Sequence, residues 1–152
     1  MPEDKIAVCE AMRESIDAIT LDWVRLVKAD AYLKSSQSLT LAQIIDHVPE
    51  MLEELCDVLE KDTPPDFMEI RASSEHGYTR SLEGYTLTQL LRELELLREA
   101  VFSFVSRLEI SRRSDIAETS QILQLVNRYF GEDIIFVVEY YLKRSNGEKA
   151  PF

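Results

Sequence analysis

The sequence predicts an all-α fold: a four- to five-helix bundle, of which a globin-like arrangement is one form. Apolar residues recur every three or four positions along most of the chain, as they do on the buried face of a helix. Only four of the 152 residues are glycine, and leucine, glutamate and arginine are abundant, which favours helices. The one strand-like stretch, residues 134–138, has no second strand to pair with. Residues 1–144 are expected to form a single domain and residues 145–152 a flexible tail.

The first predicted helix covers residues 3–28, where apolar side chains step by three or four. Cys9 and Cys56 occupy apolar positions of such patterns, so we expect them to be small buried hydrophobic residues rather than a disulfide or a metal site. The polar run at residues 35–38 is expected to be a loop.

A second helix is predicted to begin after Thr40, because Thr40 and Gln43 have the spacing of a capping box. Pro49 lies inside the apolar stripe that follows. It either kinks this helix or opens a new one at its first turn, where the missing N–H costs nothing. The proline-rich run 62–65 is expected to end the segment.

The third segment, residues 66–82, is mostly polar. Gly77 and Gly84 would each cost about 1 kcal/mol inside a regular helix, so a local reason for them is expected. Gly77 would let another backbone or a ligand approach, and Gly84 offers a helix C-terminus without steric cost.

On this segment Ala72, His76 and Arg80 share one helical face. Imidazole and guanidinium groups beside small residues suit an anion, a polar ligand or a partner carboxylate. The alternative is an internal ion-pair network that ties the segment to the acidic second helix. Both interpretations remain open at this point.

A capping box at Thr86 and Gln89 is expected to start the fourth helix, whose leucines recur at near-heptad spacing as far as Leu108. Glu93 and Glu95 do not converge by spacing on such a helix, so by spacing alone they are expected to be solvated at the surface. Residues 112–115 are expected to form a turn.

The last segment, residues 116–143, is predicted to be helical, although Gly131 interrupts it and residues 134–138 are rich in β-branched side chains. Its aromatic side chains are too many for one narrow stripe. At least half should be in the core, and the others are expected to be exposed and to pack on another chain. These residues are Tyr129, Phe130, Phe136, Tyr140 and Tyr141.

The formal net charge of −11 repels a phosphate backbone, so a nucleic-acid partner is not expected. No apolar run approaches the roughly 20 residues of a membrane span, and there is no signal peptide. We therefore expect a cytoplasmic protein that does not contact a membrane.

No glycine-rich phosphate loop, GxSxG, HExxH or cysteine-based metal site is present. The chain is therefore predicted not to be an enzyme, with no catalytic residues, no metal and no cofactor. His47 lies between the apolar positions Ile44 and Val48. It is expected to be packed and to donate to a carbonyl or carboxylate, with a ligand or pH-sensing role as the alternative.

Two stretches of the sequence resemble the RsbRD-type N-terminal domain family. One runs from Ile44 to Leu52 and includes Asp46-His47-Val48-Pro49. The other combines His76-Gly77, Arg80, Gly84-Tyr85 and the run from Thr86 to Glu93, followed by Leu96-Leu97-Arg98. Trp23 also fits the family's first helix. The resemblance covers about residues 20–105, and Leu94 departs from it, because an aromatic is common there.

The resemblance implies an all-α sensory module that works as a dimer and is usually fused to a histidine kinase or a STAS domain. It also implies a shared polar site for ligand binding or signalling. The residues of that site are His47, His76, Gly77, Arg80, Gly84, Tyr85, Glu93 and Arg98.

The expected function is thus a cytoplasmic signal-input domain of bacterial stress-response or two-component signalling. No output domain follows, so the chain is expected to be either an excised sensor or a free-standing protein that acts through a partner. One alternative is histidine phosphotransfer at His76, although the lysine and glycine expected three and four positions later are missing. Another is a haem or metal sensor that uses His47 or His76.

Overall fold

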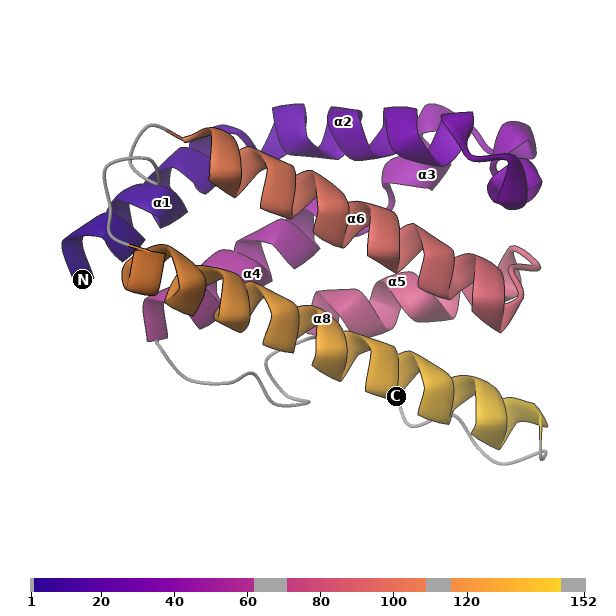
Figure 1. Cartoon of the computed structure of the whole chain (residues 1–152). Coiled ribbons are helices and arrows are strands. Elements are labelled where there is room, and N and C mark those ends of the chain that lie inside the picture. Colours follow the sequence, from indigo (N-terminus) through magenta and orange to yellow (C-terminus); the bar gives the residue numbers. More distant parts are fainter. Residues whose placement is uncertain (1, 62–70, 109–115, 146–152) are drawn as a thin grey trace.

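The computed structural model describes residues 2–61, 71–108 and 116–145 (Figure 1). Within these ranges the chain forms seven α-helices, one 3-10 helix and no strand, which confirms the all-α prediction. In chain order the elements are α1 (Pro2–Glu14), α2 (Ile16–Ala29), η1 (Ala31–Ser38), α3 (Leu41–Ile45), α4 (Val48–Lys61), α5 (Arg71–Leu82), α6 (Leu87–Arg107) and α8 (Ile116–Ser145). None of the described helices has both the length and the apolar content needed to cross a bilayer.

The helices pack in two layers. Figure 1 shows α2, α6 and α8 side by side with α6 in the middle, and α6 contacts both of its neighbours. Behind this layer α4 contacts α1, α2, α5 and α8, and α5 also contacts α8. The polar helix α5 therefore has packed elements around it, which makes burial of its side chains possible.

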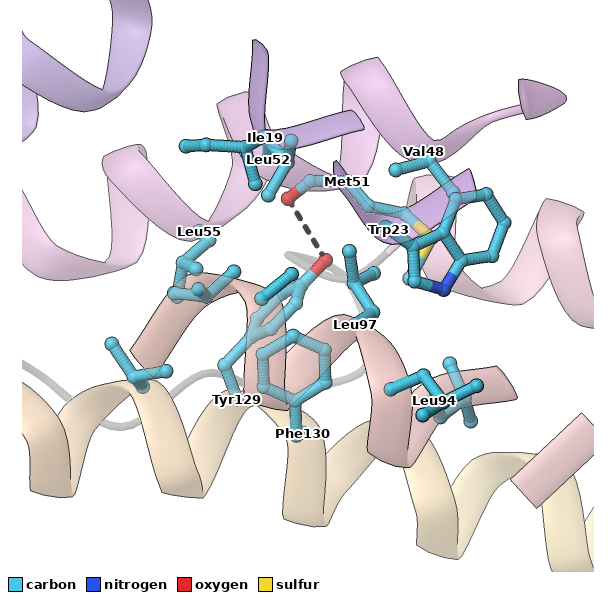
Figure 2. Close-up of a cluster of buried hydrophobic side chains, with 14 of the residues drawn as sticks. Ile19, Trp23, Val48, Met51, Leu52, Leu55, Leu94, Leu97, Tyr129 and Phe130 are labelled. Atoms are coloured by element: carbon cyan, nitrogen blue, oxygen red, sulfur yellow. Dashed lines mark hydrogen bonds between the residues drawn. The ribbon is translucent and has the colours of Figure 1, made fainter. Parts of the chain in front are cut away.

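The apolar core lies between α2, α4, α6 and α8 (Figure 2). Trp23, Tyr129 and Phe130 are its largest aromatic side chains, and each is at most 1% exposed. Full burial of side chains of this size contributes about 2 to 3 kcal/mol each. The hydroxyl of Tyr129 donates to the Met51 carbonyl at 3.2 Å, so its polar atom is satisfied inside the core.

The helix predicted over residues 3–28 is two helices, α1 and α2, with a break at Ser15. Ser15 has ψ near 14°, which turns the chain without disturbing the apolar spacing. The periodicity could not show the break for that reason. Cys9 of α1 meets Cys56 of α4, and both thiols are buried as predicted. Burial raises the pKa of Cys9 to about 11 and that of Cys56 to about 12.

Residues 35–38 belong to the 3-10 helix η1, so the predicted loop is wrong. Asp30 starts this element by accepting a hydrogen bond from the Tyr32 amide at 2.9 Å. Leu33 is completely buried, and the Ser36 hydroxyl donates to its carbonyl at 2.7 Å. Local hydrogen bonds and one apolar anchor are sufficient to order this polar run.

The predicted capping box at Thr40 is confirmed, because Thr40 and Gln43 exchange both hydrogen bonds. Of the two alternatives for Pro49, the second is correct: α3 ends at Ile45, and α4 starts at Val48 with Pro49 in its first turn. Asp46, between them, has φ of 44° and ψ of −122°. We call residues 46 and 47 the α3–α4 junction.

Gly77 and Gly84 both have the local reason that was expected. A Cβ on Gly77 would lie 3.3 Å from the Val137 side chain, so this glycine lets α5 approach α8. The close protein neighbour is thus a side chain and not another backbone. Gly84 has φ of +83°, which a glycine adopts at the end of a helix without cost.

The capping box at Thr86 is confirmed, and α8 is one helix through Gly131 and residues 134–138. The prediction that at least half of the α8 aromatics lie in the core is confirmed, because Tyr129, Phe130, Phe136 and Tyr140 are buried. The prediction that the others are exposed is wrong, because Tyr141 is partly buried. Contacts with α4, α5 and α6 cover more than one face of α8. The run 62–65, residues 66–70, the turn 112–115 and the tail from 146 on lie outside the described residues.

Two glycine substitutions should shift stability in opposite directions. Gly84→Ala should lower the free energy of unfolding by about 1 to 2 kcal/mol, because an L side chain is strained at positive φ. Gly131→Ala should raise it by about 1 kcal/mol, because Gly131 is inside a helix and a Cβ there meets nothing within 4 Å. Urea unfolding followed by circular dichroism measures both. Equal effects would contradict the backbone geometry assigned to Gly84.

Candidate functional site

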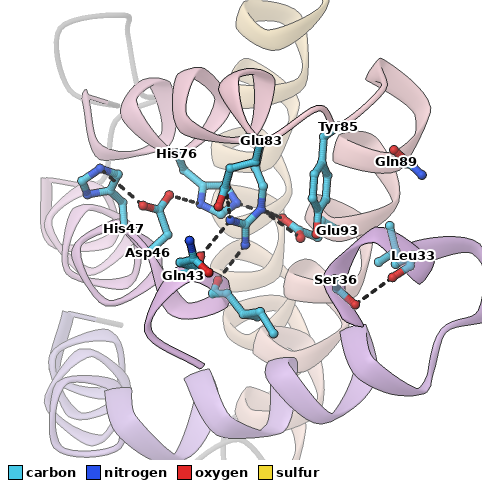
Figure 3. Close-up of polar contacts among 12 residues, drawn as sticks. Leu33, Ser36, Gln43, Asp46, His47, His76, Glu83, Tyr85, Gln89 and Glu93 are labelled. Carbon is cyan, nitrogen blue, oxygen red and sulfur yellow. Dashed lines mark hydrogen bonds and ion pairs between the residues drawn. The ribbon is translucent and has the colours of Figure 1, made fainter. Parts of the chain in front are cut away.

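Three ionisable side chains are buried together where α5 faces α6 (Figure 3). Arg80 and Glu93 are 0% exposed and His76 is 1% exposed. Charged residues are almost never fully buried unless they are paired. Their partners therefore define the site.

Arg80 and Glu93 form its central ion pair. The Arg80 Nε donates to both carboxylate oxygens of Glu93, at 2.9 and 3.0 Å. The two Nη atoms donate to the carbonyls of Gln43 and Ile44, at 2.9 and 2.7 Å. Arg80 thus satisfies carbonyls in the last turn of α3, which the helix itself leaves without partners.

Two further contacts complete the surroundings of the guanidinium. Arg80 Nη1 also donates to Glu83 at 2.8 Å. The ring of Tyr85 lies against the guanidinium, with its centroid 5.0 Å from the guanidinium carbon, in a cation–π contact. The cation of Arg80 is therefore matched by two carboxylates and an aromatic face.

His76 bridges two carboxylates. Its Nδ1 lies 2.8 Å from Asp46 Oδ2, and its Nε2 lies 3.0 Å from Glu93 Oε1 (Figure 3). The edge of Trp23 packs near the imidazole, with ring centroids 6.2 Å apart, and the Trp23 indole donates to the Glu93 carbonyl at 3.1 Å. We call Asp46, His76, Arg80, Glu83 and Glu93 the buried network.

The pKa values of His76, Asp46 and Glu93 all shift toward the charged forms. Burial alone would lower the pKa of His76, but hydrogen bonds to Asp46 and Glu93 outweigh it and raise that pKa. Burial would likewise raise the pKa of Asp46 and Glu93, and the nearby His76 and Arg80 lower both instead. The network is therefore made of charged groups.

Asp46 holds an unusual backbone position in this network. It is the only residue other than glycine with positive φ in the described ranges. Positive φ is uncommon for an L residue, and a ψ of −122° places Asp46 outside the left-handed helical region that aspartate tolerates best. The hydrogen bond from His76 anchors its side chain, which is 12% exposed. The α3–α4 junction thus depends on α5.

The structure brings four of the predicted site residues together: His76, Arg80, Tyr85 and Glu93. Of the two interpretations of the His76 and Arg80 face, the structure has the internal ion-pair network. It ties α5 to α6 and to the α3–α4 junction. The surface position expected for Glu93 from spacing alone is wrong, because its carboxylate is buried and bonded to the side chains of His76 and Arg80.

The other predicted site residues have different positions. His47 lies at the rim, its side chain 34% exposed, with its nitrogens 3.7 Å from Asp46 and 3.9 Å from Glu75. Gly77 and Gly84 shape the backbone, as described above. Arg98 makes a separate set of contacts, to Glu95 at 2.5 Å and to Asn127 at 3.0 Å.

Arg98 lines a groove of about 700 Å³ between α6 and α8. Arg92, Phe102, Leu123 and Asn127 also line it, so it combines apolar and polar walls. The groove is open to solvent, unlike the buried network. Among the predicted site residues, Arg98 is the one that this groove exposes to a small molecule.

Sequence reasoning missed Asp46 and Glu83. Asp46 lies in the motif quoted for the resemblance, immediately before His47, and an acidic residue at a helix break was the available signal. Glu83 follows Arg80 by three positions, the spacing of a helical ion pair. Neither signal distinguishes a buried carboxylate from the many exposed ones in this acidic chain.

The surroundings of His76 argue against the two alternative functions, histidine phosphotransfer and haem or metal binding at this residue. A phosphodonor needs an accessible imidazole, and His76 is 1% exposed. Haem or metal ligation at His76 needs a free ring nitrogen, and both are bonded to carboxylates. In the described part of the chain, no group of three or more histidine, cysteine or carboxylate side chains is arranged to hold a metal ion.

Comparison with known proteins gives one match. A family model described as the RsbT co-antagonist protein RsbRD N-terminal domain matches residues 17–146. No curated protein and no solved structure matches the chain. The family match covers both stretches of the site, from Asp46 to Arg98.

Removing the central charge should destabilise the fold strongly. Glu93→Gln should lower the free energy of unfolding by about 3 kcal/mol or more, because it leaves two buried cations with one carboxylate fewer. Glu95→Gln on the same helix is the matched control. It changes an exposed ion pair and should cost about 0.5 kcal/mol or less. Chemical denaturation measures both variants, and similar losses would show that the Glu93 pair is not buried.

The buried carboxylates should also make stability depend on acid pH. Because the folded pKa values of Asp46 and Glu93 are lowered, their contribution is complete above the unfolded values near about 4 and is lost as the pH falls. Urea midpoints of the native chain should therefore drop between about pH 5 and about pH 3. Glu93→Gln should show a shallower drop. An equally steep drop in that variant would contradict a lowered pKa of Glu93.

Proposed function

Because this chain belongs to the RsbT co-antagonist protein RsbRD N-terminal domain family, we propose that it is a signal-input domain of bacterial stress-response or two-component signalling and not an enzyme. It acts in the cytoplasm as a single domain, a helical bundle with a globin-like arrangement. Its output passes to a histidine kinase or a STAS-type protein, either fused to it or separate. Nucleic acid and membranes are not among its partners.

The observation that carries this proposal is the buried network. It joins three parts of the chain, the α3–α4 junction, α5 and α6, through charged hydrogen bonds. Buried ion pairs add little net stability compared with apolar packing, so their use in the interior calls for another role. A network of this kind has few alternative arrangements, so a signal that breaks one of its bonds changes how these parts are held together. That coupling is what an input domain needs.

The last helix is the proposed route to the output. Contacts of α8 with α5 and α6 place it against both helices that carry the network. On its outer side Ile135 is 50% exposed and Leu142 is 56% exposed. Exposed apolar residues at this spacing, on a helix next to the network, support contact with a second copy of the chain or with the output protein. We propose a homodimer formed through this face.

The groove beside Arg98 is the proposed entry point for a small-molecule signal. Its arginines and its asparagine offer donors, and Phe102 and Leu123 offer apolar contact. The groove lies between α6, which carries Glu93, and α8. A ligand bound there would contact α6, which the buried network joins to α5, and α8, which packs against both of these helices.

The test is association, measured for the chain alone and with a purified histidine kinase and a purified STAS-type protein. Ile135→Asp should weaken homodimerisation or partner binding about tenfold or more, because a charge replaces apolar contact area. Leu21→Asp on α2, which is 43% exposed, is the matched control and should leave association unchanged. Light scattering and titration calorimetry provide the readouts. A chain that stays monomeric and binds neither class of protein would overturn the proposal.

A further inference from the structure

The protonation state of His76 follows from its two partners. A neutral imidazole has one N–H and one lone pair, so it donates to one acceptor only. Here both ring nitrogens face carboxylate oxygens, at 2.8 and 3.0 Å. Glu93 is held ionised by the two hydrogen bonds from Arg80. His76 must therefore carry both protons for both of its contacts to be favourable.

The elements packed around α5 differ in the groups that they present near this imidazole. The carboxylate of α4 that contacts α5 is Glu54, which accepts a hydrogen bond from the Ala72 amide at the start of α5. Asp46 faces the imidazole from the α3–α4 junction, Glu93 from α6 and Arg80 from its own helix. Trp23 of α2 presents an uncharged ring, and α8 presents Val137 to the adjacent Gly77. Farther out, the ionisable groups are Glu83 and Tyr85 next to Arg80, His47 next to Asp46, and Glu75 next to His47.

The charge balance of the buried network makes the second proton of His76 important. With His76 charged, two cations meet three carboxylates, those of Asp46, Glu83 and Glu93. After the loss of one proton, a single guanidinium faces the same three carboxylates. In a site with little water that imbalance is costly.

We propose that His76 is a proton-operated lock on the α3–α4 junction: the doubly protonated ring bridges Asp46 to Glu93, and loss of one proton frees Asp46 and loosens the junction. The released proton goes to solvent, and the remaining N–H stays with Glu93. The lock is a property of the fold. Its use as a signal rests on the proposed input function.

The structure indicates why Asp46, and not Glu93, is released. Glu93 keeps both hydrogen bonds from Arg80 and is 0% exposed, so it cannot turn to water. Asp46 is 12% exposed, and its side chain is held by His76 at 2.8 Å, while His47 is 3.7 Å away. Its backbone has φ of 44°, which relaxes easily once the anchor is lost.

The hydrogen bonds that remain after Asp46 is released limit how far the structural change extends. Arg80 still holds the carbonyls of Gln43 and Ile44, so α3 stays attached. The loosened part is therefore the junction itself and the first turn of α4. Two amides report on it: Asp46, which donates to Ala42 at 2.9 Å, and Met51, which donates to His47 at 2.9 Å.

The direction of the pH dependence follows from the raised pKa of His76. A raised folded value means that the contribution is complete below the unfolded pKa of about 6.5 and is lost as the pH rises through the folded value. The lock is thus closed in acid and opens toward alkaline pH.

Nuclear magnetic resonance of the whole chain tests the proposal. At about pH 6 both ring nitrogens of His76 should carry a proton. From about pH 6 to about pH 9.5 the hydrogen-exchange protection of the Asp46 and Met51 amides, corrected for the intrinsic rate, should fall about tenfold or more. The Leu90 amide, bonded to Thr86 at 3.0 Å in α6, is the internal reference and should keep its protection.

Asp46→Asn provides the sharpest variant. The side-chain amide that this change introduces can donate to Nδ1 of a neutral His76 whose Nε2–H stays on Glu93, and asparagine matches aspartate in size and shape. The junction should then remain closed, and its protection should no longer depend on pH. Asp57→Asn, the same change at an exposed residue of α4, is the matched control and should keep the native pH dependence. His76→Gln should show the loosened junction already at about pH 6.

Three results would overturn the proposal. They are a singly protonated His76 at about pH 6, junction protection that stays constant up to about pH 9.5, and a native pH dependence in Asp46→Asn. The ring-nitrogen measurement needs only the native chain, so it tests the proposal even if the variants do not fold. None of these readouts involves a partner, so failure of the lock is distinguishable from failure of the signalling role.

Discussion

The ion pair between Arg80 and Glu93 is the interaction on which the rest of this structure depends. It joins α5 to α6, and each of its two residues also bonds to a further part of the chain. Arg80 holds the end of α3 through two carbonyls, and Glu93 holds His76, which in turn holds Asp46. Three elements far apart in the sequence are thus connected through one buried pair. Apolar contacts have no such directionality, so they could not specify this arrangement alone.

The network also explains how a polar helix comes to lie inside the protein. Four of the described side chains of α5 are buried. Three of them, Ser74, His76 and Arg80, are polar, and the fourth, Ala72, is apolar. A helix of this composition has little hydrophobic reason to pack. Charged hydrogen bonds to α6 and to the α3–α4 junction hold α5 in place instead. The missing side chain of Gly77 allows α8 to pack closely against α5. Its position therefore depends on the charge state of its partners, which is unusual for a helix in a core.

This dependence is consistent with the proposed role as an input domain. Large parts of the molecule, built on Trp23, Tyr129 and Phe130, are held by apolar packing that does not respond to ions or protons. The α3–α4 junction is held differently, by a residue of positive φ and a hydrogen bond from His76. The rigid part keeps its shape while the junction can change, and α8 lies against α5 and α6, which carry the network. Two-state behaviour needs this combination of a fixed frame and a responsive contact.

The amino-acid sequence alone was enough to predict the helical class, both capping boxes and the burial of the cysteines. Through a family resemblance it also predicted four of the residues that the site brings together, namely His76, Arg80, Tyr85 and Glu93. These features depend on the spacing of residues along the chain or on motifs, and both can be identified from the sequence. The three-dimensional structure was needed to show that Ser15 divides the first helix, that Glu93 is buried and that Asp46 and Glu83 belong to the buried network. Periodicity is blind to a single-residue break, and burial of a carboxylate depends on which helix covers it. Arg98, which the motif groups with Glu93, lies in the open groove, because residues five apart on a helix do not share a face.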